Sequence, residues 1–189
     1  MLGEWCFFKE IFSPEECSKI IELGLKLPAE KAKLGVDGNV TMDSVRRSVI
    51  RFIPKEDPNF EFLFDTLWKM AIHANNDWFN FHITRLNYIQ LAEYDSKYEG
   101  EYKRHNDVFW INKDPVYHRK LSAVVQLTDP STYKGGDLKL YSQPEPKKED
   151  IRSQGTTVFF PSFLDHQAQP VTEGKRYSLA CWFEGPKWR

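Results

Sequence analysis

The tripeptide His105-Asn106-Asp107 places two types of metal ligand two residues apart. If this segment is extended, both side chains project to the same face, so an imidazole nitrogen and a carboxylate oxygen can reach one point. The tripeptide alone is weak evidence, because such combinations also arise by chance in purely structural roles. A third ligand must come from elsewhere, and His166 is the candidate because it adjoins another strand-like segment.

Two histidines and one carboxylate on one side of a metal leave three positions open, which is the arrangement of non-haem iron(II) oxygenases. We therefore predict a metal site formed by His105, Asp107 and His166. Asp165 could in addition orient an imidazole as a hydrogen-bond acceptor. The chain has further histidines without a carboxylate two residues away, and they are not expected to be ligands: His73, His82 and His118.

A strand-like segment near the end of the chain opens with Arg176. In an extended strand this arginine shares one face with Ser178, Ala180 and Trp182, and that face is expected to look into the fold. A planar guanidinium pairs well with a planar carboxylate, such as the distal one of 2-oxoglutarate. A structural salt bridge is the alternative and stays open from the residues alone. Trp182 and Trp110 could each either pack in the core or contact a substrate.

Two helices are expected ahead of these residues. Ser13-Pro14-Glu15-Glu16 has the form of a capping box with proline at the first helical position, which predicts a helix over 14–27. Apolar residues recur with the 3.6-residue period over 58–77, so a second helix should lay its apolar stripe on a sheet. Residues 45–53 could form a strand that Pro54 ends.

From about residue 83 the pattern changes to short β-rich runs that are separated by turn residues such as Gly135-Gly136. The expected strands are 83–94, 102–110, 119–128, 137–141, 156–160, 167–171 and 176–183. This order predicts a mainly β fold with flanking helices, namely a jelly roll. We expect one domain over 1–189, with helical support over about 1–80 and the catalytic jelly roll over about 81–185.

Composition argues against several classes of function. The formal net charge is only -1 and no long basic run is present, so nucleic-acid binding is not expected. The sequence contains no run of about 18 apolar residues, so a membrane span is not expected, and no secretory signal is visible. Cys6, Cys17 and Cys181 are widely spaced, which fits free thiols in a reducing compartment. We therefore expect a cytoplasmic protein, whose oligomeric state the sequence leaves unknown.

A series of short motifs follows in order through residues 85–183. They are Tyr94…Gly100…Tyr102…His105-x-Asp107, Arg119-Lys-Leu-Ser-Ala-Val-Val-Gln-Leu-Thr-Asp-Pro, Tyr133-Lys-Gly-Gly-Asp-Leu, Gly155…Phe160-Pro-Ser, and His166…Pro170-Val-Thr-Glu-Gly-Lys-Arg176. This order resembles the prolyl-4-hydroxylase-like 2-oxoglutarate/iron(II) dioxygenases, and especially their PKHD-type branch. The resemblance implies a double-stranded β-helix, with iron(II) at His105, Asp107 and His166 and 2-oxoglutarate bound by Arg176.

The resemblance also implies further residues of the co-substrate site. Tyr94 stands where this family often has a tyrosine that helps to hold the co-substrate carboxylate. Gln126 stands where relatives often have another tyrosine, and its amide could donate to the same carboxylate. Trp182 is added as a predicted cofactor-binding residue because it shares the Arg176 face of the expected strand, not because of the resemblance. The implied reaction consumes O₂ and 2-oxoglutarate and releases succinate and CO₂, with ascorbate (vitamin C) as a candidate reductant.

The function that the resemblance implies is hydroxylation of an unactivated C–H bond, foremost in a prolyl residue of a peptide or protein. Residues 28–47 are a polar loop that could close over an extended chain as a lid. Arg46, Arg47 and Phe109-Trp110 are expected near the rim of the same site, although ordinary surface and core roles are also open to them.

Three alternatives remain. A free amino acid or small-molecule hydroxylase would use the same metal and co-substrate. A nucleic-acid demethylase of the AlkB type is disfavoured, because that family carries a second arginine at the position of Trp182. A non-enzymatic jelly-roll binding module would need no set of three ligands, and the intact His105, Asp107, His166 and Arg176 argue against it.

Overall fold

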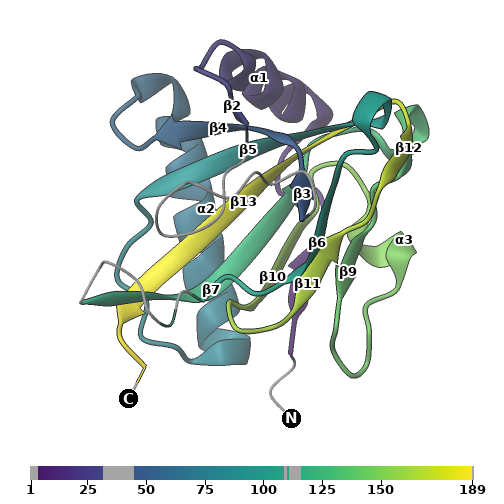
Figure 1. The fold of residues 1–189 in the computed structure, drawn as a ribbon. Coiled ribbons are helices and arrows are strands. Elements are labelled where there is room, and N and C mark those ends of the chain that lie inside the picture. Colours follow the sequence, from purple (N-terminus) through teal and green to yellow (C-terminus); the bar gives the residue numbers. More distant parts are fainter. Residues whose placement is uncertain (1–3, 32–44, 109, 111–115, 189) are drawn as a thin grey trace.

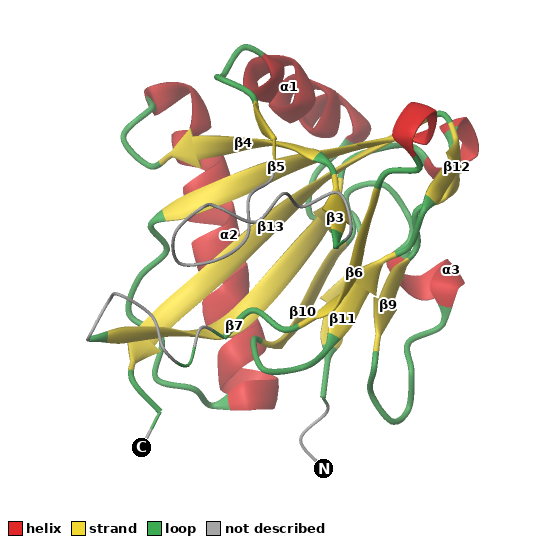
Figure 2. Cartoon of the chain, viewed as in Figure 1, coloured by secondary structure: helices red, strands yellow, loops and turns green. Residues whose placement is uncertain are grey.

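A computed structural model describes residues 4–31, 45–108, 110 and 116–188. In this part of the chain a large antiparallel sheet has helices on one side and a smaller sheet on the other (Figure 1). Figure 2 shows the same arrangement, with α2 (Glu61–Ala74) behind the large sheet and β6 (Glu101–His105), β9 (Leu138–Leu140) and β11 (His166–Ala168) in front of it. Residues 32–44 of the predicted lid and Phe109 lie outside the described residues.

The large sheet has seven strands in the order β1-β10-β7-β13-β5-β4-β2. Their bounds are β1 (Cys6–Phe8), β2 (Glu30–Lys31), β4 (Val49–Pro54), β5 (Tyr88–Asp95), β7 (Tyr117–Gln126), β10 (Thr157–Pro161) and β13 (Lys175–Pro186). β13 is the central strand, because it pairs with β5 on one side and with β7 on the other.

The small sheet has four strands in the order β3-β6-β11-β9. Their bounds are β3 (Arg46–Arg47), β6 (Glu101–His105), β9 (Leu138–Leu140) and β11 (His166–Ala168). A further pair of short strands is formed by β8 (Lys134–Gly135) and β12 (Val171–Glu173). The two facing antiparallel sheets confirm the predicted jelly roll, a double-stranded β-helix.

The helices begin close to where the sequence predicts them. α1 (Pro14–Leu25) carries the capping box, in which the Ser13 hydroxyl accepts from the Glu16 backbone and the Glu16 carboxylate accepts from the Ser13 backbone. α2 (Glu61–Ala74) continues a 3₁₀ turn at Pro58–Phe60 and runs into a π-helical turn at Asn75–Phe79. A single turn, α3 (Lys148–Ile151), lies near the small sheet. No helix among the described residues is both long and apolar enough to cross a membrane.

The main hydrophobic core lies between the helices and the large sheet. Leu63 and Leu67 of α2 are fully buried in one cluster with Leu179, Cys181 and Phe183 of β13. These three β13 residues alternate with residues that point to the other side of the sheet. The predicted alternation along this strand is therefore confirmed, and its second face is free to line a cavity between the two sheets.

Candidate metal centre and co-substrate pocket

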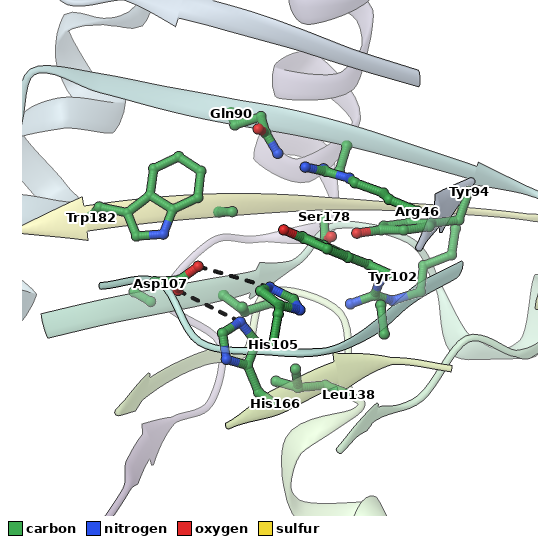
Figure 3. A pocket seen from close by; sticks show the side chains of 16 residues that line it. Arg46, Gln90, Tyr94, Tyr102, His105, Asp107, Leu138, His166, Ser178 and Trp182 are labelled. Carbon is green, nitrogen blue, oxygen red and sulfur yellow. Dashed lines mark ion pairs between the residues drawn. The ribbon is translucent and has the colours of Figure 1, made fainter. Parts of the chain in front are cut away.

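His105, Asp107 and His166 form a group whose potential metal-ligating atoms all lie within 4.8 Å of one another. His105 ends β6 and His166 begins β11, and the two are register partners in that antiparallel pair. Asp107 faces both imidazoles, with its Oδ1 3.8 Å from His105 Nε2 and its Oδ2 3.5 Å from His166 Nε2 (Figure 3). The three residues that the sequence singles out are thus brought together.

The prediction that Asp107 lies on the same strand as His105 is wrong. β6 ends at His105, and Asp107 lies in a bend whose backbone N–H donates to the Ser162 carbonyl at 2.8 Å. The Asp107 Oδ2 accepts a hydrogen bond of 2.7 Å from Ser122 Oγ, which lies 2.9 Å from Ser162 Oγ. Contacts with β7 and with the turn after β10, rather than strand alternation, therefore aim the carboxylate.

Both imidazoles are oriented by backbone carbonyls. His105 Nδ1 lies 2.7 Å from the Lys103 oxygen, and His166 Nδ1 lies 3.1 Å from the Leu164 oxygen. Because a carbonyl can only accept, each Nδ1 carries the proton and each Nε2 offers its lone pair. The Tyr102 ring stacks on His105 with centroids 3.4 Å apart, which further restricts that imidazole.

Electrostatics favour the ligand forms of these groups. Burial, together with the nearby His166, lowers the pKa of His105 to about 4. Burial by itself would raise the pKa of the Asp107 carboxyl, but His166, Arg119 and His105 outweigh it and hold that pKa below its ordinary value. At neutral pH the site therefore presents a neutral imidazole at His105 and an ionised carboxylate, as a divalent metal requires.

Arg176 lies deep beside this group and is only 2% exposed. Its Nη2 and Nε donate to Gln126 Oε1 at 2.9 and 3.3 Å, and its guanidinium carbon lies 5.3 Å from the centre of the Tyr94 ring. No carboxylate among the described residues forms an ion pair with it. A buried charge without a counter-charge is strongly unfavourable, so a carboxylate ligand would fit here. The structural salt bridge that the sequence left open is absent from this part of the chain.

One cavity contains both the metal-ligating group and Arg176. Its volume is about 500 Å³ when the space at its opening to solvent is included. The large sheet contributes Tyr94 and the Arg176 face of β13, and the small sheet contributes Tyr102 and the two histidines. Trp182 forms part of the wall and is 9% exposed, and Arg119 lies over its ring at 3.8 Å. Trp182 thus lies where it can contact a ligand.

Gln126 reaches the site indirectly. It does not line the main cavity, and it holds Arg176 from the side of a smaller neighbouring cavity. Its Oε1 accepts from the arginine, whereas the resemblance implied that its amide donates to the co-substrate. Trp110 is 57% exposed and packs against His118 at 5.9 Å, away from the main cavity.

Other predicted residues stay outside the group. Asp165 does not orient an imidazole, since its carboxylate pairs with Arg104 at 2.8 Å. His73 and His82 are exposed and His118 is buried, and none of them joins the metal-ligating group of the described residues.

Three residues of the site were missed as functional candidates or given no role, and a fourth, Arg46, was expected only at the rim. Ser122 and Ser162 hold Asp107, Tyr102 stacks on His105, and Arg46 lines the cavity. Tyr102 appeared in the motif series without a role, and Arg46 appeared only as a rim residue. The two serines stand in the motif segments Arg119-Lys-Leu-Ser and Phe160-Pro-Ser, but the sequence assigned them no role, because their contacts join segments that are far apart along the chain.

The family model of the 2OG-Fe(II) oxygenase superfamily matches residues 89–184, which is half of the chain. A PKHD-type hydroxylase of Pseudoalteromonas atlantica is 32% identical over 73 residues, covering 39% of this chain and 32% of that protein. One from Shewanella sp. (strain MR-7) is 35% identical over 72 residues, covering 38% and 31%. The matched segments thus span about a third of the length of these relatives.

Solved structures extend the likeness of fold to nearly the whole chain. A Pseudomonas putida prolyl-4-hydroxylase has a TM-score of 0.69 at 17% identity, covering 98% of this chain and 94% of that one. A Trichoplax adhaerens prolyl hydroxylase in complex with a hypoxia inducible factor peptide fragment has a TM-score of 0.73 at 18% identity, covering 96% and 83%. At these identities the structures show a shared fold. The family match over half of the chain establishes that the chain belongs to the 2OG-Fe(II) oxygenase superfamily.

Proposed function

We propose that this protein is an iron(II)- and 2-oxoglutarate-dependent dioxygenase that hydroxylates a prolyl residue in a peptide or protein. The observation that carries the proposal is the cluster of His105, Asp107 and His166 in one cavity with Arg176, a buried guanidinium without an acidic partner among the described residues. This combination has a donor set for iron(II) and a receptor for a carboxylate.

In this proposal His105, Asp107 and His166 hold the metal, and Ser122 keeps the carboxylate in place. Arg176 binds the distal carboxylate of 2-oxoglutarate, with Gln126 fixing the guanidinium. Bound iron(II) would supply the redox chemistry that couples oxidation of 2-oxoglutarate by O₂ to hydroxylation of a C–H bond. The overall reaction takes one substrate, one 2-oxoglutarate and one O₂ to the hydroxylated substrate, succinate and CO₂.

The wall residues Tyr94 and Trp182 would restrict water around the co-substrate, which favours coupling of the two half-reactions. Ascorbate would serve as reductant when the iron becomes oxidised without substrate turnover.

We further propose that residues 1–189 act as one catalytic unit. All three cysteines are buried free thiols, which supports a reducing, cytoplasmic setting.

The prolyl substrate is supported by the relatives, several of which are called PKHD-type or prolyl hydroxylases, one of them in complex with a peptide. Hydroxylation of a free amino acid is the second candidate, and the buried Arg46 in the cavity wall favours it because a free amino acid carries a carboxylate.

The test uses purified protein loaded with iron(II), with 2-oxoglutarate, ascorbate and a panel of proline-containing peptides, free proline, free lysine and methylated single-stranded DNA. Succinate formation and a mass gain of one oxygen atom on a prolyl residue are expected. Both should disappear in His105→Ala, Asp107→Ala and His166→Ala, while His73→Ala and His82→Ala should behave as the wild type. Succinate formation that persists in any of the three ligand variants would contradict the metal assignment.

A further inference from the structure

A second arginine of the cavity has no counter-charge in the described part of the chain. Arg46 on β3 lines the same cavity as Arg176 and is only 7% exposed. Its Nε donates to Ser48 Oγ at 2.7 Å, and its guanidinium lies over the Tyr102 ring at 4.4 Å. None of the ion pairs among described residues includes Arg46, and its terminal nitrogens have no hydrogen-bond acceptor there.

The neighbouring Arg47 shows that acids are available beside this strand. Its Nη2 lies 2.9 Å from a carboxylate oxygen of Glu101 and 3.6 Å from one of Glu99. Successive residues of a strand point to opposite faces, so both glutamates lie on the side of β3 that faces away from the cavity. Arg47 is therefore neutralised within the protein, whereas Arg46 faces the cavity without an acid.

Charge balance in the cavity points to one further anion. Among the described lining residues Asp107 is the one carboxylate, and Arg46 and Arg176 are guanidinium groups. A divalent metal and doubly charged 2-oxoglutarate cancel each other, and Asp107 offsets only one of the two arginines. One positive charge is left over in a buried site, where an unpaired charge is costly.

We propose that Arg46 binds a carboxylate of the prime substrate. This deepens the proposed function, on which it rests, by giving the substrate a chemical class. The Tyr102 ring contacts both the Arg46 guanidinium and the His105 imidazole, so a carboxylate at Arg46 would hold the adjoining carbon atoms close to the metal ligands. The carboxylate can belong to a free amino acid, to the C-terminal residue of a peptide or to an acidic side chain beside the reacting residue.

The test compares ligands that differ only in charge. Titrations without O₂ use protein saturated with iron(II) and 2-oxoglutarate, followed by calorimetry. The pairs are L-proline against prolinamide, a peptide ending in proline against its C-terminal amide, and an internal Asp-Pro peptide against the matching Asn-Pro peptide. At least one acid should bind about tenfold or more tightly than its neutral counterpart, the size expected for a charge-assisted pair. The pair that shows the preference identifies the source of the carboxylate.

Two glutamine variants locate the effect. Arg46→Gln should abolish the preference for the acid, whereas the matched control Arg47→Gln, on the same strand, should keep it. Thermal melts of both variants establish that they are folded. Affinity for 2-oxoglutarate should stay close to the wild-type value in Arg46→Gln.

Three outcomes would overturn the proposal. The first is that every acid binds as its neutral counterpart does, which includes the case in which neither binds. The second is a preference for the acid that survives in Arg46→Gln. The third is a loss of 2-oxoglutarate affinity in Arg46→Gln that is as large as in Arg176→Ala. Succinate formation by the wild-type protein separates this failure from failure of the proposed function. If 2-oxoglutarate turnover persists while the acid preference is missing, only the role of Arg46 falls.

Discussion

At the scale of single residues, the Asp107 carboxylate is held by one hydroxyl group. Ser122 Oγ donates to Asp107 Oδ2 at 2.7 Å, and both side chains are buried. Groups that orient metal ligands typically contribute about 10- to 100-fold to metal affinity. We therefore expect Ser122→Ala to weaken iron(II) binding by about tenfold or more, measured anaerobically by calorimetry. Ser18→Ala, at an exposed position of α1, is the control, and equal affinities in the two variants would refute the role of Ser122.

The second prediction at this scale concerns Arg176. Charge-assisted hydrogen bonds contribute about 1.5–3 kcal/mol, so Arg176→Ala should weaken 2-oxoglutarate binding by at least about tenfold, and Arg176→Lys should lose part of the affinity. Tyr94→Phe should have a smaller effect in the same direction. Titration of the metal-loaded protein with 2-oxoglutarate measures this.

Iron(II) affinity of the same variants is the internal control, since Arg176 is not in the ligand group and metal binding should survive its loss. An unchanged 2-oxoglutarate affinity in Arg176→Ala would assign this arginine to a structural role, held by Gln126 alone.

At the scale of elements, the turn after β8 packs closely against the side chain of Arg176. Gly136 has φ +64, and a Cβ there would lie 2.8 Å from Val171 Cγ2 and 3.1 Å from Arg176 Cδ. A left-handed backbone also costs an alanine about 1–2 kcal/mol. We expect Gly136→Ala to lower the melting temperature and to weaken 2-oxoglutarate binding by displacing the arginine. Gly24→Ala is the control, because its Cβ would crowd Leu91 on the helix-covered side of the large sheet.

The two glycine variants should differ in one measurement. Both should lose stability in thermal melts, but only Gly136→Ala should bind 2-oxoglutarate more weakly in its folded state. Comparable co-substrate affinity in both variants would mean that the turn serves stability alone.

Local sequence patterns predicted the elements well where they are long enough to have a period. The alternation over 176–183 correctly separates the Arg176 face of β13 from the Leu179 face, because each face meets one uniform environment. The capping box correctly predicts where α1 begins. β3 contains only Arg46 and Arg47, which is too short for any period, so the sequence could not tell the cavity-facing arginine from the one paired with glutamates.

The metal site was predictable in its residue types but not in its geometry. The spacing of His105 and Asp107 suggested one continuous strand, whereas β6 ends at His105 and the following bend is held by Ser162. Such a contact depends on how segments distant in sequence pack together, and no local preference encodes it. The same holds for the hydrogen bond from Ser122, which comes from a different strand.

At the scale of the whole molecule, the site lies between the two sheets. His105 and His166 belong to the small sheet, whereas Arg176 belongs to β13 of the large sheet. Asp107 is held from the large sheet through Ser122. A metal with a co-substrate that also pairs with Arg176 would therefore connect the two sheets across the cavity, and ligand binding should stabilise the native fold as a whole.

The last prediction follows from this connection. A ligand that binds only the folded state stabilises it by an amount that grows with its concentration, about 2.7 kcal/mol at a hundred times its Kd. Iron(II) should raise the melting temperature of the metal-free protein under anaerobic conditions, and 2-oxoglutarate should raise it further. In Arg176→Ala the metal increment should remain while the 2-oxoglutarate increment shrinks, and in His105→Ala both should shrink because the co-substrate loses its metal. Scanning calorimetry measures each protein without metal, with iron(II), and with iron(II) and 2-oxoglutarate together. An increment from 2-oxoglutarate that is as large in Arg176→Ala as in the wild type would show that the co-substrate does not bridge the sheets through this arginine.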